Sequence, residues 1–174
     1  MRPYAVISDP PYPKKFLPLY GELAEFCAKA NVPVVAVMCP QRYLPEILNL
    51  MCEHLKYRWT IAYLELGGEA ATDWEAKVNI NWKPVLLFGD RTRRIGDVVK
   101  SEANDKRFHA WGQSESGMGQ LVDRLTVPGQ LVCDPFLGGG TTAVVCMKLA
   151  RKFVGCDIEA EAVKTARLRA ETAI

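Results

Sequence analysis

Two short motifs in the sequence combine residue types that could do chemistry. One is Asp-Pro-Pro-Tyr at residues 9–12, which follows a short apolar run. The other begins at Asp134, continues through three glycines at 138–140, and is followed by a second acid, Asp157. Each acid stands where an apolar run ends, and in an open parallel sheet ligands bind at the carboxyl ends of the strands. The spacing therefore predicts that both motifs face one binding site.

The glycine-rich motif predicts a nucleotide-type ligand. Glycines allow the backbone to pass close beneath a ligand, and a helix beginning near Thr141 would offer unpaired N–H donors. Asp157 could accept hydrogen bonds from both ribose hydroxyls. A phosphate fits less well, because the turn lacks the Gly-Lys-Ser/Thr ending of a P-loop. It also lacks the G-x-G-x-x-G spacing of dinucleotide-binding turns. Asp134 would repel phosphate but suits a cationic amino-acid end, such as the methionine part of S-adenosylmethionine. The plainer alternative is a glycine turn with a helix-capping acid.

The apolar patterns predict an α/β fold in which six strands alternate with helices. Strands are expected at 4–8, 32–39, 57–66, 83–89, 130–136 and 153–158, and helices at 16–30, 44–55, 118–125, from 141 onward and at the C-terminal end. The continuous β-branched run 32–39 is typical of a central parallel strand. The alternation predicts a doubly wound, mostly parallel sheet in a single domain.

The composition limits the class of protein. The 174 residues, 49% apolar and 24% charged, are typical of one soluble globular domain. No apolar run is long enough to span a membrane and no signal segment opens the chain, so no membrane partner is expected. Six cysteines without a C-x-x-C pair indicate reduced thiols in a cytoplasmic protein. With only two histidines, no metal site is expected, and a net charge of +2 neither requires nor excludes nucleic acid.

Together, Asp-Pro-Pro-Tyr and the later Asp-Pro-Phe-Leu-Gly-Gly-Gly-Thr-Thr…Gly-Cys-Asp-Ile-Glu resemble the amino-group DNA methyltransferases. The order of the motifs matches the circularly permuted arrangement that places the catalytic motif first, as in phage and prophage modification methylases. The resemblance runs nearly the whole chain and implies a Rossmann-like, S-adenosylmethionine-dependent methyltransferase fold. It implies a catalytic half at 1–89, a candidate recognition stretch at 90–108 and a cofactor half at 109–174. It also implies S-adenosyl-L-methionine as cofactor and DNA as partner.

The resemblance gives the first motif a role in activating the exocyclic amine of a flipped base. Such an amine is a poor nucleophile, because its lone pair is delocalised into the ring. Asp9 and the Pro10 carbonyl would accept its two hydrogens, while Tyr12 would stack on the base. Adenine N6 is favoured over cytosine N4, because Asp rather than Ser opens the motif. The implied catalytic residues are Asp9, Pro10, Pro11 and Tyr12, and the implied cofactor-binding residues are Asp134, Pro135, Phe136, Gly138, Gly140, Thr141, Asp157, Gln113 and Ser114.

The chain departs from the family pattern in two places. The family usually carries a cofactor-contacting segment just upstream of the catalytic strand, and this chain begins only a few residues before that strand. Weak cofactor and DNA binding is therefore expected, unless another element such as Trp111 or a second copy of the chain closes the pocket. The segment 109–114 reads His-Ala-Trp-Gly-Gln-Ser, where the family usually has His-Pro and then Lys-Pro or Gln-Pro. A homodimer, a fused or separate upstream domain, and a non-catalytic nucleic-acid-binding module with a vestigial methylase fold stay open as alternatives.

Several weaker features have more than one interpretation. The basic residues of 90–108 could contact DNA phosphates or belong to a solvated loop. Three tryptophans could stack on bases, but tryptophans in strand patterns are more often part of the core; these are Trp74, Trp82 and Trp111. The basic residues of the last helix are interpreted as a polar face; these are Lys164, Arg167 and Arg169.

Overall fold

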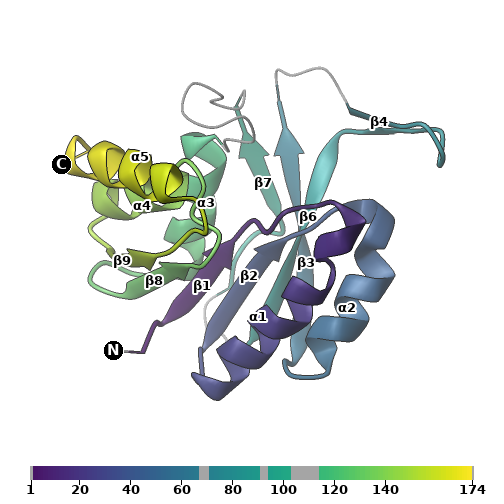
Figure 1. The fold of residues 1–174 in the computed structure, drawn as a ribbon, viewed down its shortest axis with the longest axis horizontal. Coiled ribbons are helices and arrows are strands. Elements are labelled where there is room, and N and C mark those ends of the chain that lie inside the picture. The colour runs from purple at the N-terminus through teal and green to yellow at the C-terminus, as the bar shows by residue number, and fades with distance from the viewer. Residues whose placement is uncertain (1, 67–70, 91–93, 103–113, 174) are drawn as a thin grey trace.

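The computed structural model describes residues 2–66, 71–90, 94–102 and 114–173, which form a seven-stranded sheet covered by helices on both faces (Figure 1). The strands of the sheet are β1 (Ala5–Ser8), β2 (Val34–Met38), β3 (Tyr57–Glu65), β6 (Trp82–Gly89), β7 (Val98–Ser101), β8 (Leu131–Asp134) and β9 (Lys152–Gly155). The helices are α1 (Pro18–Lys29), α2 (Leu44–Cys52), α3 (Glu115–Leu125), α4 (Thr141–Lys148) and α5 (Ala160–Glu171), with short 3-10 turns η1 (Lys14–Phe16) and η2 (Gln41–Tyr43) before α1 and α2.

The strand order is β7-β3-β6-β2-β1-β8-β9, and the sheet is mostly parallel. β6 runs antiparallel to its neighbours β2 and β3, whereas the other pairings in this sheet are parallel. Between β3 and β6 the chain forms a separate hairpin of β4 (Ala71–Asp73) and β5 (Val78–Ile80). The carboxyl ends of the parallel strands and the amino end of β6 therefore share one edge, the upper edge in Figure 1. We call it the carboxyl edge.

Alternate residues of the central strands pack against helices on opposite faces. One set, which includes Val6 and Val37, packs against α1 and α2. The other, which includes Ile7 and Met38, packs against α3 and α4. Burial on both faces explains why β2 reads as a continuous apolar run rather than an alternating one. The predicted doubly wound, Rossmann-like α/β arrangement is confirmed.

The prediction of six strands is wrong, because the main sheet has a seventh, β7. β7 lies within the stretch 90–108, in which the sequence pattern indicates no strand. Its four residues alternate between exposed and buried, which is too short a pattern to stand out in a charged segment. β7 is the outermost strand of the sheet and pairs with β3, so this part of the candidate recognition stretch forms part of the main sheet. The β4–β5 hairpin also escapes prediction, because its strands have three residues each and none of them is buried.

The cysteines of the chain are free thiols. Cys27, Cys39 and Cys146 are buried, Cys133 is half-buried, and Cys52 and Cys156 are exposed. In the part of the chain that the structure describes, no helix is both long and apolar enough to cross a membrane.

Candidate functional site

The Asp-Pro-Pro-Tyr motif lies at the carboxyl edge, directly after β1. Because β1 is flanked by β2 and β8, Asp9 emerges between the strand ends that carry Cys39 and Asp134. Burial, and after it the Asp9 carboxylate, raises the pKa of Cys39 to about 12. The same two causes hold the pKa of Tyr12 well above its ordinary value, so its hydroxyl stays protonated at neutral pH. Asp9 thus raises the pKa of both of these neighbouring side chains.

The ring of Tyr12 lies beside Lys83 of β6, a residue that sequence reasoning missed. The Lys83 ammonium is 5.8 Å from the ring centre, within the range of a cation–π contact. The same ammonium forms an ion pair with Glu65 of β3 at 2.8 Å. The side chains of Lys83 and Glu65 are only 19% and 29% exposed, so the pair is partly shielded from water. Together these contacts restrict the orientation of the Tyr12 ring.

Asp134, the acid that begins the glycine-rich motif, is buried and ties three elements together. Its Oδ1 accepts hydrogen bonds from the Ser8 hydroxyl at 2.5 Å and from the Phe136 N–H at 3.1 Å. Its Oδ2 accepts from the Thr142 hydroxyl in the first turn of α4, at 2.7 Å. Burial raises the pKa of Asp134 to about 6, although these three hydrogen bonds lower it in part and Asp9 raises it slightly. The carboxylate therefore fixes the end of β1 relative to β8 and α4.

The glycine turn leads directly into α4, which begins at Thr141 as predicted. Gly138 and Gly140 both have positive φ, of 49° and 80°. At Gly140 a Cβ atom would lie 2.5 Å from the Cβ of Ala166 in α5, which no side chain could tolerate without movement of the helix. Glycine is thus required there both by the backbone conformation and by the close approach of α5.

Asp157, which follows β9, holds the glycine turn from the opposite side. Its Oδ2 accepts from the Gly138 N–H at 2.8 Å, and its Oδ1 accepts from the Glu159 N–H at 3.0 Å. Asp157 thus stabilises the local backbone, as a capping acid would. Its carboxylate also keeps lone pairs that could accept hydrogen bonds from the ribose of a ligand. The next residue, Ile158, is fully exposed at 101%, an apolar side chain left bare beside the turn.

Arg169 of α5 corrects the interpretation of the last helix as only a polar face. Its guanidinium donates to the Gly139 carbonyl of the glycine turn and to the Glu115 carboxylate in the first turn of α3, at 3.1 Å for the latter. Glu115 also pairs with Lys148 of α4 at 2.7 Å. The Arg169 side chain is 10% exposed. It therefore connects the glycine turn to α3 and α5.

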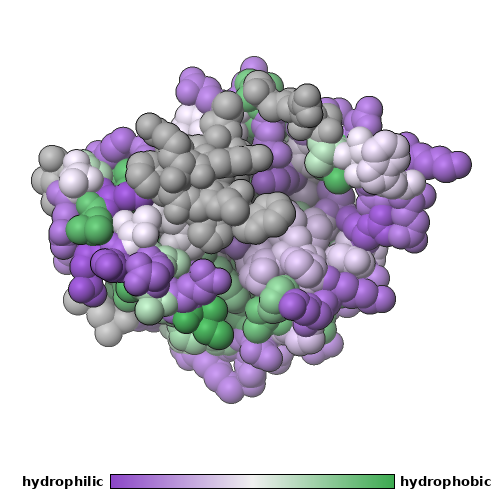
Figure 2. All heavy atoms as spheres, turned by 45° about the horizontal axis from the view of Figure 1, so that its top comes forward, coloured by the Kyte–Doolittle hydropathy of each residue, from purple (hydrophilic) through white to green (hydrophobic). Residues whose placement is uncertain are grey.

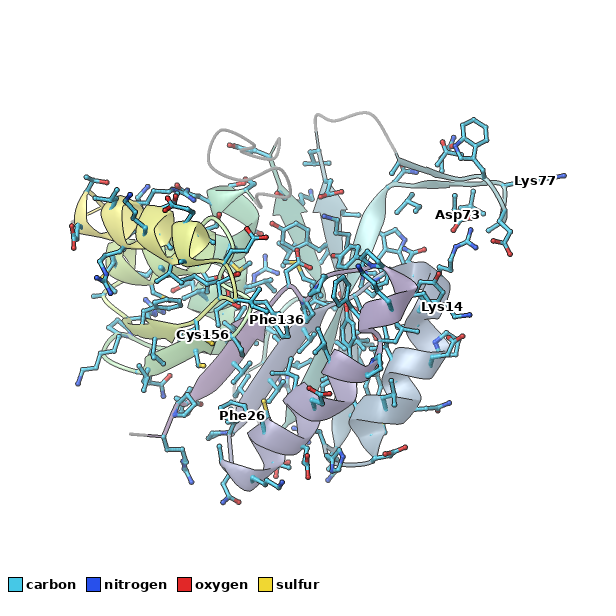
Figure 3. All side chains as sticks on the ribbon, in the orientation of Figure 1. Lys14, Phe26, Asp73, Lys77, Phe136 and Cys156 are labelled. Carbon is cyan, nitrogen blue, oxygen red and sulfur yellow. The ribbon has the colours of Figure 1, made fainter. Side chains whose placement is uncertain are left out.

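The structure does not bring every predicted site residue to the glycine turn. Gln113 lies outside the described residues, as do His109 and Trp111. The Ser114 hydroxyl accepts from the Ser116 N–H and so caps α3, which is the role that the structure shows for it. The Phe136 side chain packs against the α1 and α2 core (Figure 3). Pro135 lies in the turn itself, and Thr141 is the first residue of α4.

Two of the three candidate stacking tryptophans are described, and they differ. Trp82, at the start of β6, is half-buried, and its carbonyl accepts from the Gln41 amide at 2.9 Å. Trp74, in the turn of the β4–β5 hairpin, is 84% exposed. Of the candidate recognition stretch, Arg94 and Lys100 are exposed, while Arg91, Arg93, Lys106 and Arg107 lie outside the described residues. Among the residues that the structure describes, no group of three His, Cys, Asp or Glu side chains is placed to hold a metal ion.

Comparison with known proteins decides the family. The model of the DNA methylase family for N6 and N4 enzymes matches residues 53–168, which is most of the chain. The chain belongs to this family. The Type II methyltransferase M2.DpnII of Streptococcus pneumoniae is 40% identical over 126 residues, which are 71% of this chain and 46% of that protein. The Type II methyltransferase M1.MboII of Moraxella bovis is 56% identical over 50 residues, 26% of this chain and 19% of that protein. The chain thus spans about half, or less, of the curated relatives that it matches.

Solved structures agree on the fold of this DNA methylase family member. The M1.HpyAVI–SAM complex matches with a TM-score of 0.76 at 23% identity, over 97% of this chain and 90% of that chain. The PvuII DNA methyltransferase, described as cytosine-N4-specific, matches with a TM-score of 0.79 at 15% identity, over 96% of this chain and 79% of that chain. Both likenesses extend over nearly the whole chain and show a methyltransferase fold.

Proposed function

We propose that the chain transfers a methyl group from S-adenosyl-L-methionine to the exocyclic amine of a DNA base. The observation that carries the proposal is the 2.5 Å hydrogen bond from Ser8 to Asp134. Ser8 immediately precedes Asp9, and Asp134 begins the glycine-rich motif, so motifs 126 residues apart in sequence meet at one point. A base held at Asp9 and a methyl donor held at the glycine turn would be neighbours, as a direct transfer between them requires. Membership of the DNA methylase family supports the same reaction.

Asp9 and Pro10 make the amine nucleophilic in this proposal. The Asp9 carboxylate and the Pro10 carbonyl accept the two N–H hydrogens, so the nitrogen can pyramidalise and its lone pair is released from the ring. Pro10 and Pro11 fix φ and offer no N–H that would compete as a donor. The bound cofactor supplies an electrophilic methyl group on sulfur. During transfer of that methyl group, the Asp9 carboxylate would stabilise the positive charge that develops on the amine nitrogen and would accept the surplus proton or pass it to solvent.

Tyr12 supplies the surface on which the flipped base stacks. Tyr12 is half-buried, and the ammonium of the Lys83–Glu65 ion pair lies beside its ring on one side. The raised pKa of its buried hydroxyl keeps the ring neutral beside Asp9. A neutral, restrained aromatic ring next to the acceptor carboxylate is suited to a base that must be presented edge-on to Asp9.

The residues around the glycine turn fit S-adenosyl-L-methionine. Gly138 to Gly140 keep the backbone free of side chains where the ligand approaches, and α4 begins at Thr141. Asp157 would accept from the ribose hydroxyls with its remaining lone pairs. The exposed Ile158 would cover one face of the adenine ring. Asp134 would attract the cofactor's ammonium group, and Gln113 and Ser114 remain predicted partners of its carboxylate.

Adenine N6 is the proposed target within DNA. Asp rather than Ser opens the catalytic motif, and on this ground we favour adenine over cytosine N4. The proposed partner is thus DNA, in the cytoplasm. A homodimer or an upstream domain would add to this site without changing its chemistry.

The proposal is tested by separating chemistry from cofactor binding with two substitutions. Methyl transfer from labelled S-adenosylmethionine to unmethylated duplex DNA is measured together with cofactor affinity by calorimetry. Asp9→Ala should lower transfer by orders of magnitude and leave cofactor affinity within about two-fold. Asp157→Ala should weaken cofactor binding by about ten-fold or more, because charge-assisted hydrogen bonds contribute roughly 1.5–3 kcal/mol each. Wild-type transfer rates in Asp9→Ala would remove Asp9 from the mechanism, and a wild-type chain that binds DNA without transferring methyl would be a non-catalytic module.

A further inference from the structure

The β4–β5 hairpin carries an exposed tryptophan that the proposed reaction does not use. Trp74 lies in the turn between Asp73 and Val78 and is 84% exposed. Tryptophan is usually highly buried, so an indole left this bare is available to contact another molecule. The hairpin projects from the carboxyl edge of the sheet (Figure 1), the edge that also carries the Asp-Pro-Pro-Tyr motif.

The hairpin is held in this position by contacts with η2, the short turn that follows β2. Arg42 of η2 donates to both oxygens of Asp73, at 2.8 Å from its Nε, and also pairs with Glu75. The Ala76 N–H donates to Asp73 at 2.8 Å, which closes the turn around the same carboxylate. The two residues on either side of Trp74, Asp73 and Glu75, are therefore both bound to Arg42, so the turn that carries Trp74 is held in place.

Basic residues outnumber acids when the hairpin turn and η1 are taken together. Arg42 pairs with both acids of the turn, Asp73 and Glu75, and Lys77 balances their second negative charge. Lys77 points away from the body of the molecule at the hairpin tip (Figure 3). Lys14 and Lys15 are exposed in η1, directly after the catalytic motif. In Figure 2 the projecting right-hand side of the molecule is largely hydrophilic.

The distance between the hairpin and the catalytic motif suits one continuous duplex. Val78 is five residues before Lys83, which contacts Tyr12. At about 3.3 Å per strand residue, plus one cross-strand step, Trp74 lies at most about 25 Å from Lys83. The span is therefore at most about seven base-pair steps of 3.4 Å each. A duplex with its target base at Tyr12 could therefore reach the hairpin without bending.

We propose that the β4–β5 hairpin binds the duplex DNA that flanks the target base, with Trp74 contacting bases in a groove and Lys77, Lys14 and Lys15 contacting phosphates. The inference rests on the proposed function, because it takes DNA as the substrate. It assigns DNA binding to a segment outside the stretch 90–108. Aromatic side chains that contact bases, by stacking or as wedges, are a recurrent device for such binding.

The test compares two exposed tryptophans at opposite edges of the sheet. Trp59, 56% exposed, lies near the start of β3, far from the carboxyl edge, and serves as the matched control. Affinity for a fluorescein-labelled, unmethylated duplex of mixed sequence is measured by anisotropy. Trp74→Ala should weaken binding by about five- to 150-fold, the range expected for loss of one base–aromatic contact. Trp59→Ala should bind as the wild type does. Lys77→Gln should lower the slope of log affinity against log salt by about one.

Further measurements separate this inference from the proposed function. Trp74→Ala should leave cofactor affinity unchanged and should regain wild-type methyl transfer at saturating DNA. If the wild type methylates DNA and Trp74→Ala binds it equally well, the hairpin assignment is overturned while the proposed function stands. If Trp74→Ala sediments as a smaller species than the wild type and binds DNA equally well, the hairpin is a self-association surface and the assignment to DNA binding is overturned. A wild-type chain that neither binds nor methylates the duplex would overturn both proposals.

Discussion

Asp134 should reduce the stability of the folded chain at neutral pH, and Asp134→Asn should remove that cost. Burial raises the pKa of this carboxyl from its ordinary value of 3.8 to about 6. A group whose folded pKa is raised binds its proton more tightly in the folded state, so stability falls as pH rises from the unfolded to the folded pKa. With 1.36 kcal/mol for each tenfold change in acidity, the full penalty above pH 7 is about 3 kcal/mol. Asparagine has no charge to bury and can still accept from Ser8 and Phe136.

The assay is urea unfolding of the wild type and of Asp134→Asn between pH 4 and 8. The difference between the two free energies of unfolding isolates Asp134, because other titrating groups are common to both proteins. We expect the wild type to lose up to about 3 kcal/mol relative to the variant as pH rises from 4 to 7. Asp90→Asn removes a carboxylate whose side chain is 87% exposed and serves as the control for loss of one acidic charge. Parallel pH curves for wild type and Asp134→Asn would refute the reasoning that this carboxylate is buried at a cost.

Three further predictions address the same site. Gly140→Ala should lower the free energy of unfolding by about 2–5 kcal/mol, because it adds overpacking against Ala166 to the strain of a positive φ. Gly129 has a similar φ of 82° but open space around it, so Gly129→Ala should lower the same free energy by only about 1–2 kcal/mol. Equal losses for the two variants in urea unfolding would contradict this. Arg169→Met should lower that free energy by about 1–3 kcal/mol and weaken cofactor binding in calorimetry, while Arg167→Met on the exposed side of the same helix should do neither. Asp134→Asn should weaken cofactor binding, because the cofactor's ammonium group would favour the ionised carboxyl. For the same reason the wild type should release a proton when it binds the cofactor near pH 6. Calorimetry in buffers of different ionisation heat measures this proton, and proton uptake would count against the contact.

The acids of the site could be found from the sequence, because each interrupts an apolar run. Asp9 and Asp134 are polar residues at the ends of buried strands, and a parallel sheet brings such ends to one edge whatever the details of packing. The glycine turn was equally accessible, since positive φ at Gly138 and Gly140 leaves few other residue types. These features depend on local sequence and on one topological rule.

The supporting contacts could not be found in this way, because they join residues far apart in sequence. The Ser8–Asp134 bond spans 126 residues, and Arg169 reaches Gly139 over 30 and Glu115 over 54. Lys83 reaches Tyr12 only because β6 runs antiparallel, and the hydrophobic pattern of a buried strand contains no information about its direction. β7 could not be predicted for a different reason, because four alternating residues in a charged segment are too few to give a periodic hydrophobic pattern.

In the proposed mechanism, Asp9 activates an exocyclic amine of a DNA base for methyl transfer. This role is measured by nucleoside mass spectrometry of unmethylated DNA incubated with the chain and S-adenosyl-L-methionine labelled in its methyl group. We expect labelled N6-methyladenine with the wild type and none with Asp9→Ala. Asp9→Asn should keep partial activity, because its amide oxygen can still accept one N–H. Labelled N4-methylcytosine would contradict the assignment to adenine. Label on a ring carbon, or equal labelling by wild type and Asp9→Ala, would contradict the mechanism itself.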